Sequence, residues 1–198
     1  VLLPEIFALQ MTASGDVNFP KTVTSYFSIF DMIARHLPIV ETEIGLDHWP
    51  NVYCGVAVLM FFILYLLCKK ISAKEKAVYC VMLLFFFASF SFNVLNFIWH
   101  GFHYPNSLPC RQSYIYIFMV LFACYRAYMY LKETPWKHVT AAFAGSVVFV
   151  LMAQKLVTED HFHFIVYYVA ILFLALYLGA IALYQRGRRY YFPALFYA

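Results

Sequence analysis

Charge is scarce in this chain of 198 residues: only 12% are charged, against about 25% in a typical soluble domain. Hydrophobic residues make up 64% and aromatic residues 21%. The charge-free runs are 52–68, 77–110, 112–125, 139–154 and 164–185. A bilayer core takes about 20 mostly apolar residues per helix, and lipid leaves backbone groups to be satisfied inside that helix. The runs therefore predict membrane helices, because buried helices of a soluble protein would leave nothing polar enough to cover them.

Several functional motifs are also missing. The sequence has no Gly-rich phosphate loop, no nucleophile elbow and no nucleic-acid-binding motif, and no secretory signal is visible. Its net charge of +4 comes from basic residues in short loops, so we expect no nucleic-acid partner. The five cysteines show no metal-ligand spacing. Cys54 and Cys110 could pair in an oxidising compartment, although small buried hydrophobic residues are the commoner role.

These runs predict an all-α fold: a polytopic transmembrane helix bundle with about five full spans and partial spans at both ends. We expect a single transmembrane domain over residues 1–198. Residues 1–13 would end a preceding span, 14–50 would form an outer loop, and 51–198 would hold spans and short loops. The apolar beginning and end lead us to expect an internal or C-terminal-half fragment of a longer protein.

Basic residues alternate along the loops. Residues 69–76 hold four Lys, 132–138 two Lys and 185–189 three Arg, whereas 97–111 holds only Arg111 and 157–163 none. Lys and Arg are enriched in cytoplasmic loops. The pattern therefore predicts that 69–76, 132–138 and 185–189 are cytoplasmic and that 14–50, 97–111 and 157–163 lie outside.

The outer loop 14–50 carries more acidic than basic residues. Within it Tyr26, Phe30, Ile33 and Leu37 recur at helical spacing, which predicts a short amphipathic helix on the membrane face. The carboxylates Asp16 and Asp31 are expected to be solvated loop charges.

The best-marked candidate site begins at the end of the run 77–110. Asn93 and Asn96 are three residues apart, so they would share a helix face. An amide in a membrane helix needs a partner on another helix or a wet cavity, and both readings stay open. Pro105 and Pro109 are expected to end this helix.

Arg111 follows these prolines. If Asn106 or Ser107 caps a new helix, Arg111 would lie in its first turn. The free N–H groups there and the guanidinium could together bind a phosphate at the depth of the headgroups. The alternative is that Arg111 only anchors the helix at the interface.

His100 and His103, also three residues apart, could bind a metal, or a haem with a histidine from another helix. No third ligand has a matching spacing, and interfacial histidines more often cap polar loops.

The residues 93–109, NVLNFIWHGFHYPNSLP, followed by Arg111 and an aromatic-rich helix, resemble the signature stretch of the bacterial YfhO family. The segments NFPK at 18–21 and NVYCG at 51–55 also resemble that family's outer loop and the start of its next span. The similarity extends over most of the chain, although the last spans are generic.

This resemblance implies a membrane glycosyltransferase similar to the GT-C fold. Such an enzyme would move a sugar from a polyprenyl-phosphate carrier to a cell-surface polymer such as lipoteichoic acid, on the outer face of a bacterial membrane. The catalytic carboxylate of GT-C enzymes would lie upstream of Val1, so no catalytic residue is assigned. No cofactor is expected, though a divalent metal is compatible with the chemistry. The substrate-binding residues we expect are Arg111, His100, His103, Asn96, Asn106, Trp99 and Tyr104.

Two other functions remain open. A transporter or flippase for lipid-linked sugars would favour broken helices near mid-membrane and an internal repeat. The sequence shows no convincing repeat. A non-catalytic scaffold for envelope assembly is the third.

Overall fold

The computed structural model describes residues 4, 19–44, 48–102, 109–157 and 162–187. Within these ranges the regular structure is helical, which confirms the all-α prediction. The helices are α2 (Ile29–Ala34), α3 (Ala57–Leu67), α4 (Ala73–Ser91), α5 (Asn93–Trp99), α6 (Ser113–Met129), the 3₁₀-helix η2 (Leu131–Glu133), α7 (Trp136–Leu156) and α8 (Phe164–Gln185).

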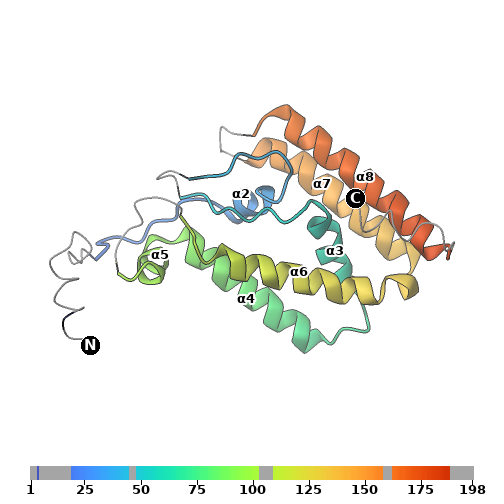
Figure 1. The fold of residues 1–198 in the computed structure, drawn as a ribbon, viewed down its shortest axis with the longest axis horizontal. Coiled ribbons are helices and arrows are strands. Elements are labelled where there is room, and N and C mark those ends of the chain that lie inside the picture. The colour runs from blue at the N-terminus through green and yellow to red at the C-terminus, as the bar shows by residue number, and fades with distance from the viewer. Residues whose placement is uncertain (1–3, 5–18, 45–47, 103–108, 158–161, 188–198) are drawn as a thin grey trace.

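The long helices form two layers, and shorter helices lie between these layers. In Figure 1, α7 and α8 lie on one side and α4 and α6 on the other, with α2 and α3 between. Helix α3 packs against α6, α7 and α8, while α4 packs against α5 and α6. Accordingly Met60 and Tyr65 of α3 are fully buried. The core therefore runs along α3, and α2 extends it toward one end of the bundle.

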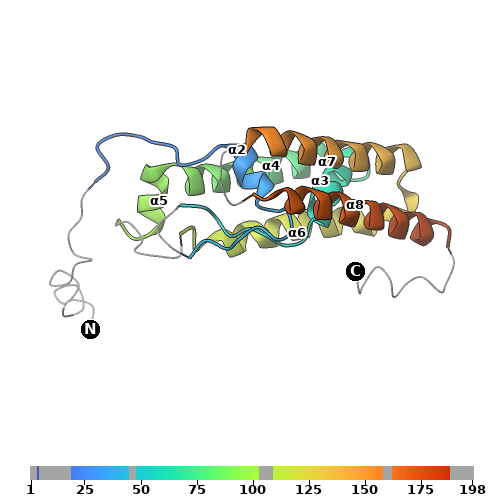
Figure 2. The same ribbon diagram turned by 90° about the horizontal axis from the view of Figure 1, so that it is seen from above.

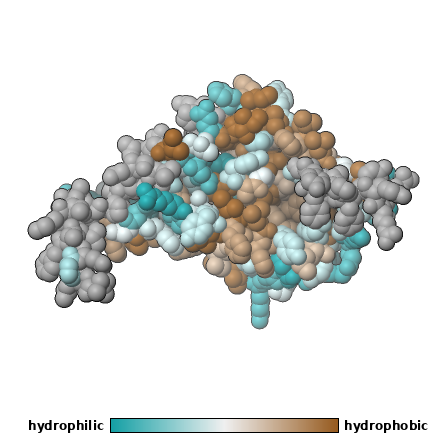
Figure 3. All heavy atoms as spheres, in the orientation of Figure 1, coloured by the Kyte–Doolittle hydropathy of each residue, from teal (hydrophilic) through white to brown (hydrophobic). Residues whose placement is uncertain are grey.

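Two helices of the described residues, α7 and α8, are long and apolar enough to cross a membrane. Their exposed side chains are largely apolar, and such side chains gather over this part of the surface in Figure 3. The other helices are shorter or more charged: α3 has 11 residues and α6 has 17. An 11-residue helix reaches only about half of a 30 Å hydrocarbon core. Five full spans therefore remain a prediction.

Polar contacts tie the basic loops together at one end of the bundle. The Arg126 guanidinium donates hydrogen bonds to both carboxylate oxygens of Glu75, at 3.0 and 3.1 Å. Lys70 forms an ion pair with Glu133. The Gln185 amide donates to the carbonyl of Leu131 at 2.7 Å. The loops predicted to share one side of the membrane thus contact one another.

At the other end of the bundle, Phe92 separates α4 from α5 because its backbone is extended rather than helical. An extended segment, residues 22–27, runs alongside this break, and Ser25 forms an isolated antiparallel bridge with Phe92. The Tyr26 N–H donates to the Ser91 carbonyl at 2.9 Å, and the Asn93 N–H donates to the Thr24 carbonyl at 3.1 Å. The break is therefore hydrogen-bonded on both sides.

Side chains reinforce this pairing. The Asn93 amide accepts from the Thr24 N–H at 3.0 Å and donates to the Thr22 carbonyl at 2.8 Å. The Ser91 hydroxyl donates to the Phe27 carbonyl at 2.6 Å. Asn93 therefore bonds an extended segment rather than a neighbouring helix, and it shares no uninterrupted helix with Ser91.

Helix α2 corresponds to the predicted amphipathic helix, but it is shorter and differently oriented. Tyr26 precedes it, and Phe30 is 41% exposed, whereas Leu37 just beyond it is fully buried. The carboxylate of Asp31 accepts from the Ser28 N–H at 2.9 Å in a capping box. Asp31 is therefore buried and is not the solvated loop charge that we expected, because its carboxylate accepts a backbone hydrogen bond at the start of α2.

We expect Asn93→Ala to release residues 22–27. Loss of the two side-chain hydrogen bonds that join Asn93 to Thr22 and Thr24 should lower the free energy of unfolding by about 1–3 kcal/mol. Hydrogen–deuterium exchange in detergent should show faster exchange at residues 22–27. Thr140→Ala is the matched control, because Thr140 is exposed and its hydroxyl bonds only carbonyls of its own helix. Unchanged exchange in Asn93→Ala would contradict this role.

Candidate functional site

Helix α5 ends earlier than the prolines predicted. Its C-cap is His100, and Gly101 follows with φ +70°, a left-handed conformation that glycine adopts without strain. The Phe102 N–H donates to the Phe97 carbonyl at 3.0 Å, and the Gly101 N–H donates to the Ile98 carbonyl at 3.1 Å. The rings of Phe97 and Phe102 are 6.1 Å apart. This is a Schellman motif with its hydrophobic contact, so Gly101, not Pro105, terminates the helix.

Three predicted site residues lie on or just after α5. Asn96 is fully buried, and neither its amide nitrogen nor its amide oxygen has a hydrogen-bond partner among the described residues. Trp99 is 42% exposed and lies against Phe86, with ring centroids 6.2 Å apart. His100 Nδ1 is 2.8 Å from the Asn96 carbonyl, which fixes the ring against the end of the helix. Asn96 and His100 are thus adjacent, and Trp99 points back toward α4.

Arg111 lies in a turn before α6 rather than in its first turn. The helix begins at Ser113 with Gln112 as N-cap, and no side chain caps it. Cys110 has φ +55°, so the chain turns sharply just before Arg111. Arg111 is exposed and forms no hydrogen bond or ion pair within the described ranges. The prediction of its helical position was wrong, because the turn at Cys110 delays the start of α6.

Several predicted residues fall outside the described ranges: His103, Tyr104, Asn106, the helix-ending Pro105 and the possible helix cap Ser107. Their predicted parts in the site stay predictions. Among the residues that are described, no three His, Cys, Asp or Glu side chains gather where they could hold a metal ion. Cys54 and Cys110 are both free thiols, so the possible disulfide between them is not formed.

Sequence reasoning missed Arg35, which is 3% exposed and organises this end of the bundle. Its guanidinium donates to the carbonyls of Pro50 and Glu41, both at 2.8 Å, and to the side-chain oxygen of Asn51 at 3.4 Å. The Asn51 amide in turn accepts from the Glu43 N–H at 2.9 Å and donates to the Glu43 carbonyl at 2.7 Å. The signal that could have identified Arg35 is a lone cation next to the apolar stretch of α2.

The described residues thus include a buried amide without a hydrogen-bond partner at Asn96, a half-exposed ring at Trp99 and an exposed cation at Arg111. Among these residues no hydrogen bond or cation–π contact joins Arg111 to Asn96 or Trp99, so the grouping of the three in one site stays a prediction. The family model of the bacterial membrane protein YfhO matches residues 1–197.

The chain belongs to the YfhO family.

Membership in the YfhO family establishes this chain as part of a bacterial membrane protein. No curated protein and no solved structure matches the chain. The family match covers the signature stretch at 93–109, so the resemblance drawn from those residues is confirmed. For this YfhO-family chain, the roles of individual site residues remain predictions.

We expect Arg35→Lys to destabilise the loop 41–51 although it keeps the charge. A lysine cannot reproduce the planar guanidinium that reaches three acceptors at once. The free energy of unfolding should fall by about 2 kcal/mol, measured by thermal or chemical unfolding in detergent. Arg186→Lys, at the exposed end of α8, is the control and should change little. Equal stability of the two variants would refute the assignment.

Proposed function

We propose that this chain forms part of a membrane glycosyltransferase. The enzyme takes a sugar from a polyprenyl-phosphate carrier and transfers it to a cell-surface polymer, such as lipoteichoic acid, on the outer face of the membrane. Membership in the YfhO family and the exposed position of Arg111 support this proposal.

The observation that carries the proposal is the contrast between two arginines at the end of the bundle opposite the basic loops. At the end where α5 meets the start of α6, Arg35 is bonded to main-chain carbonyls, whereas Arg111 is exposed with no bonding partner among the described residues. A cation in this state can bind an anionic ligand without first breaking an ion pair.

The reaction assigns separate tasks to separate groups. Transfer of the sugar leaves a negative charge on the departing phosphate, which a guanidinium stabilises. A carboxylate must accept the proton of the acceptor hydroxyl. Asp31 does not fit that task, because its carboxylate is occupied in the capping box of α2. The base is therefore a carboxylate other than Asp31.

A second candidate function, transport or flipping of a lipid-linked sugar, is favoured by one observation. The interruption between α4 and α5 at Phe92 resembles the discontinuous helices that line transporter sites. However, the backbone groups around this break are bonded to residues 24–26. They are therefore already occupied, which supports an enzyme more than a transporter.

Arg111→Ala in the full-length protein should reduce glycosylation of the surface polymer by about 10- to 100-fold, because a charge-assisted hydrogen bond to phosphate is lost. Arg111→Lys should retain part of the activity. The measurement is sugar content per polymer chain, with the amount of protein in the membrane quantified in parallel. Arg186→Ala, at the basic end, is the control and should leave glycosylation unchanged.

Normal glycosylation by Arg111→Ala at normal abundance would exclude the phosphate site. An experiment in which the lipid-linked sugar is added directly to the outer face of vesicles distinguishes the two functions. An enzyme transfers the sugar from that donor to the polymer, whereas a transporter adds nothing once the donor is already outside.

A further inference from the structure

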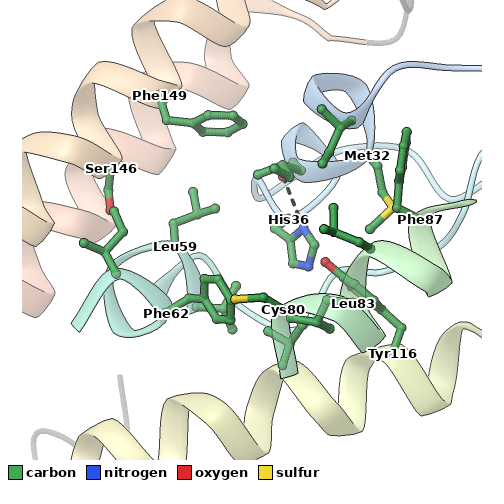
Figure 4. Close-up of a pocket in the computed structure, with 16 residues that line it drawn as sticks. Met32, His36, Leu59, Phe62, Cys80, Leu83, Phe87, Tyr116, Ser146 and Phe149 are labelled. Atoms are coloured by element: carbon green, nitrogen blue, oxygen red, sulfur yellow. Dashed lines mark hydrogen bonds between the residues drawn. The ribbon is translucent and has the colours of Figure 1, made fainter. Parts of the chain in front are cut away.

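A cavity of about 430 Å³ lies in the centre of the described structure, between the two helix layers. Figure 4 shows side chains from several parts of the chain directed into it. They include His36 just after α2, Phe62 of α3, Leu83 of α4, Tyr116 of α6 and Phe149 of α7. A methylene group takes up about the 30 Å³ that a water molecule occupies in the liquid, so the cavity has room for one aliphatic chain of about 14 carbons.

His36 places a polar atom in a largely apolar wall. His36 is 2% exposed, and its Nε2 has no hydrogen-bond partner in the described structure. In Figure 4 this nitrogen and the hydroxyl of Tyr116 point toward the same part of the cavity. The two rings have centroids 5.7 Å apart. A buried polar atom without a partner carries a free-energy cost, which a ligand that supplies the missing hydrogen bond would remove.

The hydrogen bonds of His36 determine what that ligand must offer. Nδ1 lies 3.2 Å from the Ile33 carbonyl, which can only accept, so Nδ1 carries the proton. Burial lowers the pKa of His36 to about 4, so the imidazole is neutral at physiological pH. Nε2 is therefore an acceptor, and it requires a donor such as a hydroxyl group.

The same lining excludes a charged headgroup. Among the described residues that line the cavity there is no Lys, Arg, Asp or Glu. The hydroxyl of Ser146, at its edge, already donates to the Ala142 carbonyl at 2.9 Å. A phosphate or carboxylate buried here would lose its hydration without gaining a counter-charge.

The cavity lies where the two layers separate. Helix α7 packs against α3 and α8, and α4 packs against α5 and α6, but α4 and α7 make little contact with each other. Leu83 and Leu84 of α4 and Phe149 of α7 line the cavity from opposite sides. Since α7 is a candidate membrane span, this separation offers a lipid chain a lateral route from the bilayer.

We propose that the cavity binds an uncharged lipid alcohol, with its aliphatic chain among the apolar side chains and its hydroxyl group donating to Nε2 of His36. This site differs in place and chemistry from the phosphate site proposed at Arg111, and it does not depend on glycosyl transfer.

The test uses the full-length protein in lipid nanodiscs and a photoreactive dodecanol that carries a diazirine on its chain. Irradiation should label peptides from α3, α4 and α7. Unlabelled dodecanol should compete about tenfold better than dodecane, because only the alcohol forms the hydrogen bond. Dodecyl phosphate should compete poorly. Equal competition by dodecane, or stronger competition by dodecyl phosphate, would overturn the proposal.

Two variants test the position of the ligand. Leu59 lines the cavity, so Leu59→Trp should fill it and abolish labelling, whereas Leu172→Trp on the exposed face of α8 should not. His36→Phe removes both the unpaired Nε2 and the Nδ1 bond to the Ile33 carbonyl, which keeps its bond from the backbone N–H of residue 36. Its stability should therefore change little, and it should lose the preference for alcohol over alkane. Wild-type labelling of folded Leu59→Trp, or an unchanged preference in His36→Phe, would refute the site. Arg111→Ala should leave labelling intact, which separates this test from that of the proposed function.

Discussion

The pairing of residues 22–27 with the break between α4 and α5 is the interaction on which this end of the molecule depends. A helix interrupted among apolar side chains leaves N–H and carbonyl groups without partners, which is costly away from water. Here the backbone of 24–26 and the side chains of Ser91 and Asn93 satisfy those groups. The same pairing leads the chain past α4 into α2 (Figure 2), and α2 lies between the two helix layers (Figure 1). The central cavity exists because α2 and the residues after it form one of its walls.

Arg35 completes this arrangement from the other side of α2. Its guanidinium bonds carbonyl groups on both sides of the loop 41–51, so the chain returns to α3 along a defined path. A buried cation is tolerable here because several oxygens surround it and Trp49 lies 6.0 Å from it. The positive charge of Arg35 is therefore structural. This leaves Arg111 as the more accessible arginine, which is why the proposed phosphate site rests on it.

The sequence predicted the helical class, the grouping of basic loops at one end and the family, because charge-free runs and a long polar motif are local features. It did not predict the end of α5 at Gly101, because a Schellman motif and a proline are both plausible stops in the same stretch. It also misplaced Arg111, since the turn at Cys110 depends on packing rather than on local residue preference. The burial of Asp31 and the contacts of Arg35 and Asn93 join segments far apart in the chain, and no periodicity reveals such contacts.

The two proposed sites bind lipid groups of different charge: a phosphate at Arg111 and an uncharged alcohol in the cavity. Arg111 is exposed beside the start of α6, where a phosphate can keep part of its hydration while it pairs with the guanidinium. The cavity around His36 offers one neutral acceptor and no charge, so the free-energy cost of desolvating a phosphate would exceed what one hydrogen bond returns. A phosphate-bearing carrier must therefore keep its headgroup at the end of the bundle. A lipid alcohol has no such requirement and can enter the space between the layers completely.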